Sequence, residues 1–481
     1  MDDVLFDRPE HPEEACGVFG AHAPGEDVGR LTYFGLQALQ HRGQESAGIA
    51  VADGTTLTAY KNLGLVTQVF RPSDLDSLSG HLSIGHTRYS TTGSSTSWEN
   101  AQPQLSSIGP NTIALAHNGN LVNTVELRDR LRGEGIRFRS TSDTEVMVTL
   151  IDHFTQVHNS IRAGIVEAMK LIRGAYSAVM MTEEAVYAFR DPYGVRPLVL
   201  GKLDDRGWVI ASETCGLDIV GAEHVRDVAP GEVVKIGEAG VESWQAVPAE
   251  KPSLCVFEFI YFARPDSVMY DCTLYEARER LGAALARSAP ADADMVMGVP
   301  DTGVPGAIGF ANASGIPFGE GLVKNRYVGR TFISPTQLMR QQGIRLKLNP
   351  LRHALAGKRV VVVDDSIVRG NTTRKLVALL REAGAAEVHM RITSPPVKWP
   401  CFYGIDTDTQ EQLIASSNDV EAIRAHIGAD SLAYLSVDDM VEAIDSGHEG
   451  DFCLACFDGR YPIEIPETVK RGKLALETAE S

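Results

Sequence analysis

The sequence predicts two unlike halves: an α+β half with sheets stacked between helices, followed by an α/β half built on a parallel sheet. Residues 16–245 consist of short strands separated by turns, with helical stretches at 27–41 and 143–158. From about residue 254 to 440, strands alternate with helices, which is the pattern of βαβ units. A length of 481 residues exceeds one typical core and predicts two to four domains.

The boundaries follow from changes in pattern. Residues 237–253 lose periodicity and carry Gly, Pro and charge, so we expect the domain linker there. This predicts domains over 16–245 and 254–465, followed by a polar tail at 466–481. The first 15 residues are acidic and lack an apolar stretch, which excludes a secretory signal.

Composition excludes several classes of protein. A net charge of −18 argues against nucleic-acid binding, which needs a basic surface. The absence of a run of ~18 apolar residues argues against a membrane span, and we expect a cytoplasmic location. The seven cysteines are odd in number and scattered, so they predict catalytic or metal-binding roles in place of a disulfide framework. Cys215 and Cys272 lie in no motif, and we expect them to be ordinary thiols.

Residues 360–373 (VVVVDDSIVRGNTT) carry the strongest motif. Four consecutive β-branched residues predict a strand covered on both faces. Asp364 and Asp365 follow where that strand should end. This is the edge at which open α/β sheets bind ligands. A turn with hydroxyls and glycine then leads into a helix predicted over 374–383. The backbone N–H groups of such a turn, together with the positive end of the helix, can bind an anion. We call this predicted phosphate-binding turn the cradle, and it comprises Ser366, Ile367, Val368, Arg369, Gly370, Asn371, Thr372 and Thr373. The motif indicates a sugar phosphate, with carboxylates that could also help to hold Mg²⁺; the alternative is an ordinary strand–loop–helix crossover.

Cys16 is the candidate nucleophile of the first half. Alone, a cysteine before glycine is more often a small buried hydrophobic residue. Three later segments favour catalysis, because each joins a turn to groups that could hold an amide substrate: HRGQESAG (41–48), GHTRYSTTG (85–93) and AHNGN (116–120).

The motif at 360–373 resembles the phosphoribosyl-diphosphate (PRPP) signature of type I phosphoribosyltransferases, and the first half resembles the N-terminal-nucleophile glutaminases. Together, roughly residues 16–465 resemble the glutamine PRPP amidotransferase family. The resemblance implies an αββα glutaminase domain followed by a parallel-sheet phosphoribosyltransferase domain. It also implies ammonia transfer from glutamine to PRPP, giving 5-phosphoribosylamine, glutamate and pyrophosphate at the first committed step of purine (IMP) synthesis. A homotetramer inhibited by purine nucleotides is expected.

For the glutaminase domain, the resemblance implies that residues 1–15 are a propeptide whose removal frees the α-amino group of Cys16. That amine can then act as a base for the thiol. The resemblance places Asn118 and Gly119 in the oxyanion hole. Arg88 is expected to bind the glutamine carboxylate and Asp143 its ammonium, with Arg42 also at the glutamine site. From the sequence alone, Asp143 is equally a plain helix N-cap.

For the transferase domain, the resemblance places Asp364 and Asp365 at the ribose hydroxyls and Mg²⁺, with Thr302 a further metal ligand. The family often has serine where this chain has Gly303, which removes one hydroxyl ligand. Residues 321–337, with Lys324 and Arg330, are expected to form a lid over the diphosphate; the alternative is a solvated basic loop. Tyr261 is the candidate interdomain contact.

Four cysteines stand out: Cys255, Cys401, Cys453 and Cys456. The last two form a C-x₂-C pair, and the first two lie beside aromatic residues in distant segments. Four thiolates suit either zinc or an iron–sulfur cluster, and the residues do not separate the two. Resemblance to the Bacillus-like branch of the family implies a [4Fe–4S] cluster.

Two other classes of function compete. A different class II amidotransferase would share the first half but lack the PRPP motif. A PRPP-sensing regulator would keep the second half without catalysis, but it would have no need for the set formed by Cys16, Arg88 and Asn118.

Overall fold

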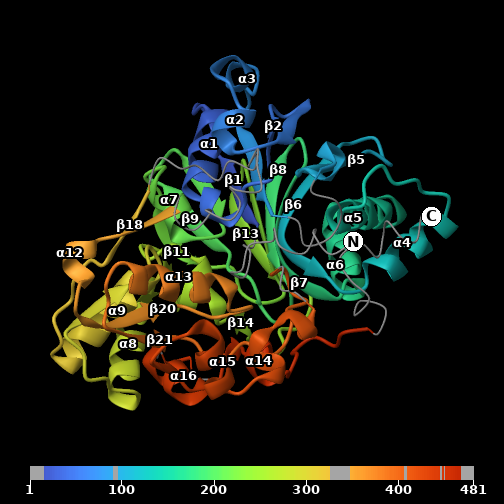
Figure 1. Cartoon of the computed structure of the whole chain (residues 1–481). Helices are drawn as coiled ribbons and strands as arrows, with labels where there is room; N and C mark the ends of the chain where they lie inside the picture. The colour runs from blue at the N-terminus through green and yellow to red at the C-terminus, as the bar shows by residue number, and fades with distance from the viewer. Residues whose placement is uncertain are drawn as a thin grey trace.

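The structure is a computed structural model, and it describes residues 16–89, 96–325, 347–405, 409–444, 447–448 and 450–466. The predicted propeptide and most of the polar tail lie outside these ranges. Figure 1 shows the N-terminal half (16–245) above and to the right, and the C-terminal half (254–466) below it. Among the described residues, no helix is both long and apolar enough to cross a membrane.

Two antiparallel sheets form the centre of the N-terminal half. The first has the strand order β11-β9-β10-β1-β4-β2-β3, and the second β13-β12-β8-β7-β6-β5. The strands of the first are β11 (Glu223–Asp227), β9 (Val199–Leu203), β10 (Gly207–Ala211), β1 (Gly17–His22), β4 (Leu82–Arg88), β2 (Ser46–Ala52) and β3 (Leu57–Leu63). Those of the second are β13 (Gly240–Gln245), β12 (Glu232–Gly237), β8 (Ala185–Arg190), β7 (Gly174–Met181), β6 (Ile113–Leu121) and β5 (Gln104–Ser106).

The predicted stacking of sheets between helices is confirmed. Alternate residues of each strand point to opposite faces, so in β7 Val179 packs between the sheets while Ala178 packs under the helices. The first sheet is covered by α1 (Val28–Ala38), α2 (Val66–Val69), α3 (Pro72–Asp76) and α7 (Thr214–Asp218). The second is covered by α4 (Thr124–Gly133), α5 (Asp143–His158) and α6 (Ile161–Leu171). Asp27 caps α1 by accepting from Arg30 N–H, and η1 (Gln40–Arg42) and η2 (Trp98–Asn100) are single 3₁₀ turns.

The linker prediction needs a correction. Residues 240–245, expected within the linker, form the edge strand β13, which pairs with β12. An edge strand has one exposed side, which explains why its polar sequence resembles a connection. The connection between the halves is therefore shorter than predicted.

The C-terminal half contains a parallel sheet of order β17-β20-β21-β22, as the alternating pattern predicted. Its strands are β17 (Met295–Gly298), β20 (Arg359–Asp364), β21 (Glu387–Ile392) and β22 (Ser431–Tyr434). One face packs on α13 (Asn371–Glu382) and α15 (Val420–Ile427). The other packs on α8 (Leu274–Ser288), α9 (Gly303–Ser314) and α16 (Val437–Ile444). The run Val360–Val363 is buried on both faces, which is why its sequence is apolar without alternation.

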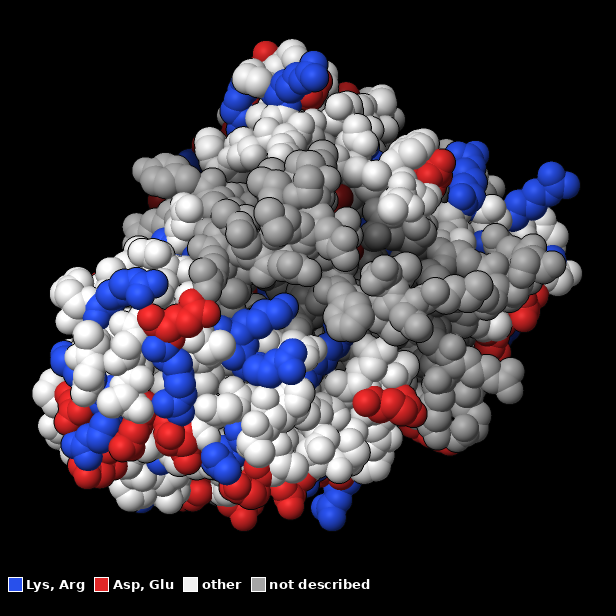
Figure 2. Space-filling model, in the orientation of Figure 1, with Lys and Arg blue, Asp and Glu red and all other residues white. Residues whose placement is uncertain are grey.

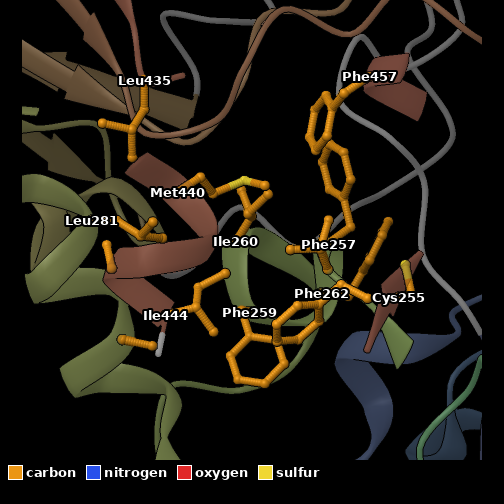
Figure 3. Close-up of a cluster of buried hydrophobic side chains, with 14 of the residues drawn as sticks. Cys255, Phe257, Phe259, Ile260, Phe262, Leu281, Leu435, Met440, Ile444 and Phe457 are labelled. Atoms are coloured by element: carbon orange, nitrogen blue, oxygen red, sulfur yellow. The ribbon is translucent and has the colours of Figure 1, made fainter. Parts of the chain in front are cut away.

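Small elements complete this half and join it to the N-terminal half. They are β15 (Val268–Met269), β16 (Cys272–Thr273), β18 (Leu322–Lys324), β19 (Leu348–Pro350), α12 (Arg352–Leu355), η4 (Gln410–Gln412), α14 (Ile414–Ser417) and α17 (Ala455–Asp458). The strands β14 (Leu254–Cys255) and β23 (Phe452–Cys453) pair in parallel, so the two ends of the half lie together. The π-helix η3 (Glu258–Phe262) follows β14 and enters a cluster that also includes Val122 and Val195 of the N-terminal half. Figure 3 shows part of this cluster, with Phe257 stacked on Phe457 at 5.6 Å between ring centroids.

Candidate active sites and cysteine cluster

Cys16 lies directly before β1 and is 5% exposed. Its Sγ donates to the carbonyl of Tyr89 at 3.2 Å and accepts from the Tyr89 N–H at 3.4 Å. Burial raises the pKa of the thiol to about 12, and the charge of Arg88 offsets part of this rise. In this environment the thiol is protonated at neutral pH, so a nucleophilic thiolate needs a base.

Asn118 and Gly119 lie in β6, which is tied to β4 by a hydrogen bond between His86 Nε2 and the His117 carbonyl at 3.1 Å. Asn118 is fully buried, and neither atom of its side-chain amide has a hydrogen-bond partner within the described ranges. A buried amide without a partner costs about 1–3 kcal/mol, so it calls for a functional reason. Gly119 has φ +140, and a Cβ there would lie 2.0 Å from the Ala175 carbonyl oxygen, so only glycine fits.

Asp143 is the first residue of α5, but it is not the cap. Ser142 is the N-cap and accepts from the Thr144 N–H, so the plain-cap alternative for Asp143 is wrong. The carboxylate accepts from the Leu121 N–H at 3.1 Å and lies 3.5 Å from His117 Nε2. Burial raises its pKa, but His117 and the Leu121 N–H outweigh burial and lower it, which keeps the group ionised.

Arg88 ends β4 and is 2% exposed, and its Nη1 lies 3.8 Å from Glu45 Oε2. Both Arg88 and Asp143 act electrostatically on Cys16. The structure thus gathers a cation, an anion, a thiol and a buried amide at one end of the two sheets. Sequence reasoning missed Glu45 and His117, although both lie inside the quoted turn segments.

The prediction that Arg42 binds glutamine needs a correction. Its guanidinium is completely buried, with Nε donating to Glu213 and Nη2 donating to Glu258 at 2.6 Å. Burial alone would lower its pKa, but the two carboxylates raise it above the ordinary value. Glu213 also accepts from Ser267 Oγ at 2.6 Å and from the Arg264 N–H at 2.9 Å. Arg42 therefore joins the two halves, and sequence reasoning missed both glutamates because they lie far along the chain.

Asp364 and Asp365 lie at the carboxyl end of β20, as predicted. Asp365 N–H donates to Asp364 Oδ1 at 3.0 Å, and Ser366 Oγ donates to Asp365 Oδ1 at 2.7 Å. Burial and the charge of Asp365 raise the pKa of Asp364 well above its ordinary value. Two buried carboxylates side by side favour a cation or a shared proton.

Thr302 Oγ1 donates to Asp365 Oδ2 at 2.5 Å, so the structure brings this predicted ligand to the acidic pair. A Cβ on Gly303 would lie 2.5 Å from the Val363 carbonyl oxygen, which explains why serine is absent at this position. Lys324 forms an ion pair with Asp301, beside Thr302. Arg330 lies outside the described residues.

The cradle residues 366–373 lead from β20 into α13, and Gly370 takes φ +81 as the N-cap. The helix starts at Asn371, three residues before the predicted start. A depression of about 250 Å³ adjoins the cradle and is lined in part by Arg369, Asn371 and Glu411. Figure 2 shows Lys and Arg side chains gathered over this part of the C-terminal half.

The four cysteines come together where the halves meet. Cys255 and Cys453 are register partners in the β14–β23 pair, and the Tyr403 N–H donates to Cys401 Sγ at 3.4 Å. Burial raises the pKa of Cys456 well above its ordinary value, and the other three cysteines raise it further. Burial likewise raises the pKa of Cys255 to about 12. Among the described residues, no three His, Cys, Asp or Glu side chains are arranged as a site for a metal ion.

Tyr261 lies in η3, half-buried against the cluster that joins the halves. This position agrees with the predicted interdomain contact. The same π-helix carries Glu258, which forms a buried ion pair with Arg196 of the N-terminal half; Arg196 Nη1 lies 3.3 Å from Glu258 Oε1. Neither residue carried a sequence signal.

Comparison with known proteins assigns both halves. The glutamine amidotransferase domain model matches residues 86–218, and the phosphoribosyl transferase domain model matches residues 273–393. The amidophosphoribosyltransferase of Synechococcus elongatus is 58% identical over 479 residues, 99% of this chain and 97% of the relative. That of Bacillus subtilis is 48% identical over 456 residues, 94% of this chain and 95% of the relative.

Solved structures agree. The structure described as the allosteric regulatory enzyme of purine biosynthesis matches with a TM-score of 0.90 and 47% identity, over 96% of this chain and 99% of its own. The B. subtilis glutamine PRPP amidotransferase complexed with ADP and GMP matches with a TM-score of 0.88 and 48% identity, over 94% of this chain and 98% of its own. This chain belongs to the amidophosphoribosyltransferase family.

Proposed function

We propose that this chain transfers ammonia from glutamine to PRPP in two steps at two sites, with ammonia released at Cys16 and captured at the 364–373 cradle. The products are 5-phosphoribosylamine, glutamate and pyrophosphate, and the reaction is the first committed step of purine biosynthesis. One observation carries the proposal: a single chain holds two reactive arrangements. The first is a buried thiol near Arg88 and Asp143, in a domain that also holds a buried amide without a partner among the described residues, and the second is a buried acidic pair at the start of the phosphate cradle.

In the first step, the Cys16 thiolate attacks the side-chain amide carbon of glutamine. Because burial raises the pKa of this thiol to about 12, forming the thiolate requires a base. The α-amino group of Cys16, with an ordinary pKa of about 8, becomes that base once residues 1–15 are removed. It takes the thiol proton and returns it to the leaving nitrogen, so ammonia departs and a thioester remains. Water then attacks the thioester, which yields glutamate and restores the thiol.

The surrounding groups bind and polarise the glutamine. Arg88 faces the α-carboxylate and Asp143, held ionised by His117 and Leu121, faces the α-ammonium. The side-chain amide of Asn118, which has no partner among the described residues, and the N–H of Gly119 bind the oxyanion of the tetrahedral intermediate. One such donor contributes about 3–4 kcal/mol.

In the second step, ammonia attacks C1 of PRPP as the C1–O bond to pyrophosphate breaks. Residues 366–373 hold the 5′-phosphate at the start of α13, and Asp364 and Asp365 accept from the ribose hydroxyls. Asp364, Asp365 and Thr302 also have the oxygen donors that suit Mg²⁺, and a cation would relieve the repulsion between the two carboxylates. Bound Mg²⁺ would offset the charge of the leaving pyrophosphate. Lys324 and Arg330 belong to the segment that would cover the diphosphate.

The proposed glutaminase site is in contact with residues 402–404 of the C-terminal half. Asn120 Nδ2, one residue beyond Gly119, donates to the Phe402 carbonyl at 3.0 Å. Gly404 lies so close to Gly119 that a Cβ on it would be 2.9 Å from the Gly119 Cα. A change in the C-terminal half can therefore move β6, which carries Asn118 and Gly119 and is called the oxyanion strand below. We therefore expect PRPP to raise glutaminase activity.

We assign the four cysteines to a [4Fe–4S] cluster. They are sulfur donors from three segments, they are close enough to raise each other's pKa, and they join the two ends of the C-terminal half. When bound, the cluster would serve as a structural link between β14, β23 and residues 401–404. Iron and sulfide analysis of anaerobically purified protein tests this assignment, and stoichiometric zinc without iron would refute it.

Regulation and assembly follow the same family pattern. We expect purine nucleotides to inhibit, in line with the nucleotides bound to the B. subtilis relative, and we expect a cytoplasmic homotetramer. Inhibition assays with purine nucleotides and mass measurement in solution test these expectations.

Intact-mass measurement combined with two activity assays tests the function. A mature chain that begins at Cys16, and that uses either glutamine or ammonia to consume PRPP, is the expected result. Cys16→Ser should lose use of glutamine and keep use of ammonia. A fully active protein that retains residues 1–15 would refute the amine-base mechanism.

A further inference from the structure

One donor of Arg196 has no acceptor within the described part of the chain. Its side chain is completely buried, Nε donates to the Tyr403 carbonyl at 3.0 Å, and Nη1 donates to Glu258 Oε1 at 3.3 Å. Its remaining nitrogen, Nη2, has no hydrogen-bond partner among the residues that the structure describes. A buried cationic N–H without an acceptor is costly, so this nitrogen calls for a ligand or another function.

The surroundings of Arg196 include two of the predicted cluster ligands, Cys255 and Cys401. The Cys255 N–H donates to the carbonyl of Val195, the residue before Arg196, at 3.0 Å. Tyr403, which accepts from Arg196, donates its own N–H to Cys401 Sγ at 3.4 Å. Cys255 and Cys401 both interact electrostatically with the guanidinium. Two of the four cysteines, both from the C-terminal half, thus lie near this guanidinium of the N-terminal half.

We propose that Arg196 donates a hydrogen bond from Nη2 to a sulfur atom of the iron–sulfur cluster, either a cysteine thiolate or an inorganic sulfide. The proposal rests on the assignment of the four cysteines to that cluster. A cluster held by four thiolates is anionic, and a buried guanidinium is a matching donor. Hydrogen bonds to cluster sulfurs stabilise the more negative reduced state and so raise the reduction potential.

The same side chain links the cluster to the glutaminase site. The Tyr403 carbonyl that Arg196 holds is followed by Gly404, which abuts Gly119. Phe402, on the other side of Tyr403, accepts from Asn120. Arg196 is therefore a positioning residue for the oxyanion strand, and loss of the cluster should impair use of glutamine more than use of ammonia.

The variant Arg196→Lys tests this role because it keeps the charge and loses the planar fork. In anaerobically purified full-length protein, we expect wild-type iron and sulfide content and a more negative midpoint potential, measured by an EPR-monitored titration. Iron loss to a chelator should be ~10-fold faster or more. The ratio of glutamine-dependent to ammonia-dependent rates should fall. The matched control is Arg190→Lys, which alters a buried arginine bonded to the Val228 and Gly194 carbonyls and should keep the wild-type potential.

A measurement on the unmutated protein covers the case in which Arg196→Lys does not fold. Wild-type protein labelled with ¹⁵N in the arginine guanidinium groups should show nitrogen hyperfine coupling to the reduced cluster. No coupling, or an Arg196→Lys variant with the wild-type potential and iron-loss rate, would overturn the hydrogen bond while leaving the cluster in place. Wild-type protein without iron would instead overturn the cluster itself, and this proposal with it.

Discussion

Replacing Gly404 with alanine tests whether residues 401–404, the segment that begins with Cys401, support the oxyanion strand β6. A Cβ on residue 404 would lie 2.9 Å from both the Cα and the carbonyl carbon of Gly119. Carbon atoms in contact are about 3.5–4.0 Å apart, so one of the two segments must move by roughly half an ångström or more. Because Gly119 itself has no room toward Ala175, the shift should displace its N–H from the oxyanion position.

The size of the effect follows from the proposed oxyanion hole of Asn118 and Gly119. Complete loss of one donor costs about 3–4 kcal/mol, or 10²–10³ in kcat, and a displaced donor retains part of that contribution. We therefore expect Gly404→Ala to lower the glutamine-dependent kcat by ~10–100-fold. The ammonia-dependent rate should remain close to wild type, because ammonia bypasses the glutaminase site.

The control is Gly428→Ala. Gly404 and Gly428 have φ +105 and +76, so both substitutions strain the backbone, but a Cβ on Gly428 meets nothing within 4 Å. Each strain costs roughly 1–3 kcal/mol of stability, which urea unfolding measures. The reasoning would be refuted if Gly404→Ala kept the wild-type ratio of glutamine to ammonia rates, or if Gly428→Ala changed it equally.

Three further predictions concern single residues. Asn118→Ala should lower the glutamine-dependent kcat by ~10²–10³-fold and spare the ammonia-dependent rate, since it removes an oxyanion donor; equal losses in both assays would contradict this. Asp365→Asn should lower both synthetic rates together by ~100-fold or more, because a metal's charge stabilisation contributes several kcal/mol; calorimetry of PRPP with Mg²⁺ checks whether binding weakens as well. For Glu213, burial raises the pKa of the carboxyl, but Arg42 and His41 outweigh burial and lower it below its ordinary value. Its stabilisation is therefore present above about pH 4.3 and is lost as the pH falls toward the folded pKa. Glu213→Gln should cost about 3–5 kcal/mol at pH 7 and should flatten the acid dependence of the unfolding free energy, so identical pH slopes in the two proteins would count against this account.

Local patterns were sufficient for much of the fold. The helix predicted over 143–158 is α5 with the same bounds, and the run Val360–Val363 is a strand buried on both faces. Both predictions rest on side-chain periodicity, which reflects burial by any neighbouring layer. The strand β13 was missed because an exposed edge strand has no such periodicity.

The predicted site residues also divide into those that a local pattern indicates and those whose role depends on distant partners. Asp364, Asp365 and the cradle are consecutive in the chain, so their order was enough to predict a site that local backbone geometry could assemble. The role of Arg42 was misjudged because its partners, Glu213 and Glu258, lie 171 and 216 residues away. Asp143 was ambiguous until Ser142 proved to be the cap.

The amino-acid sequence was enough to predict the two-domain architecture and the family, and to propose the residues of the two reactive centres, because each depends on short-range order or on motifs. Packing of the two halves established the rest. It buried Arg42 between two carboxylates and Arg196 against Glu258, placed four distant cysteines together, and set Gly404 against Gly119. These contacts join segments that are far apart in the chain, and their energies depend on desolvation and close packing, which no local pattern encodes.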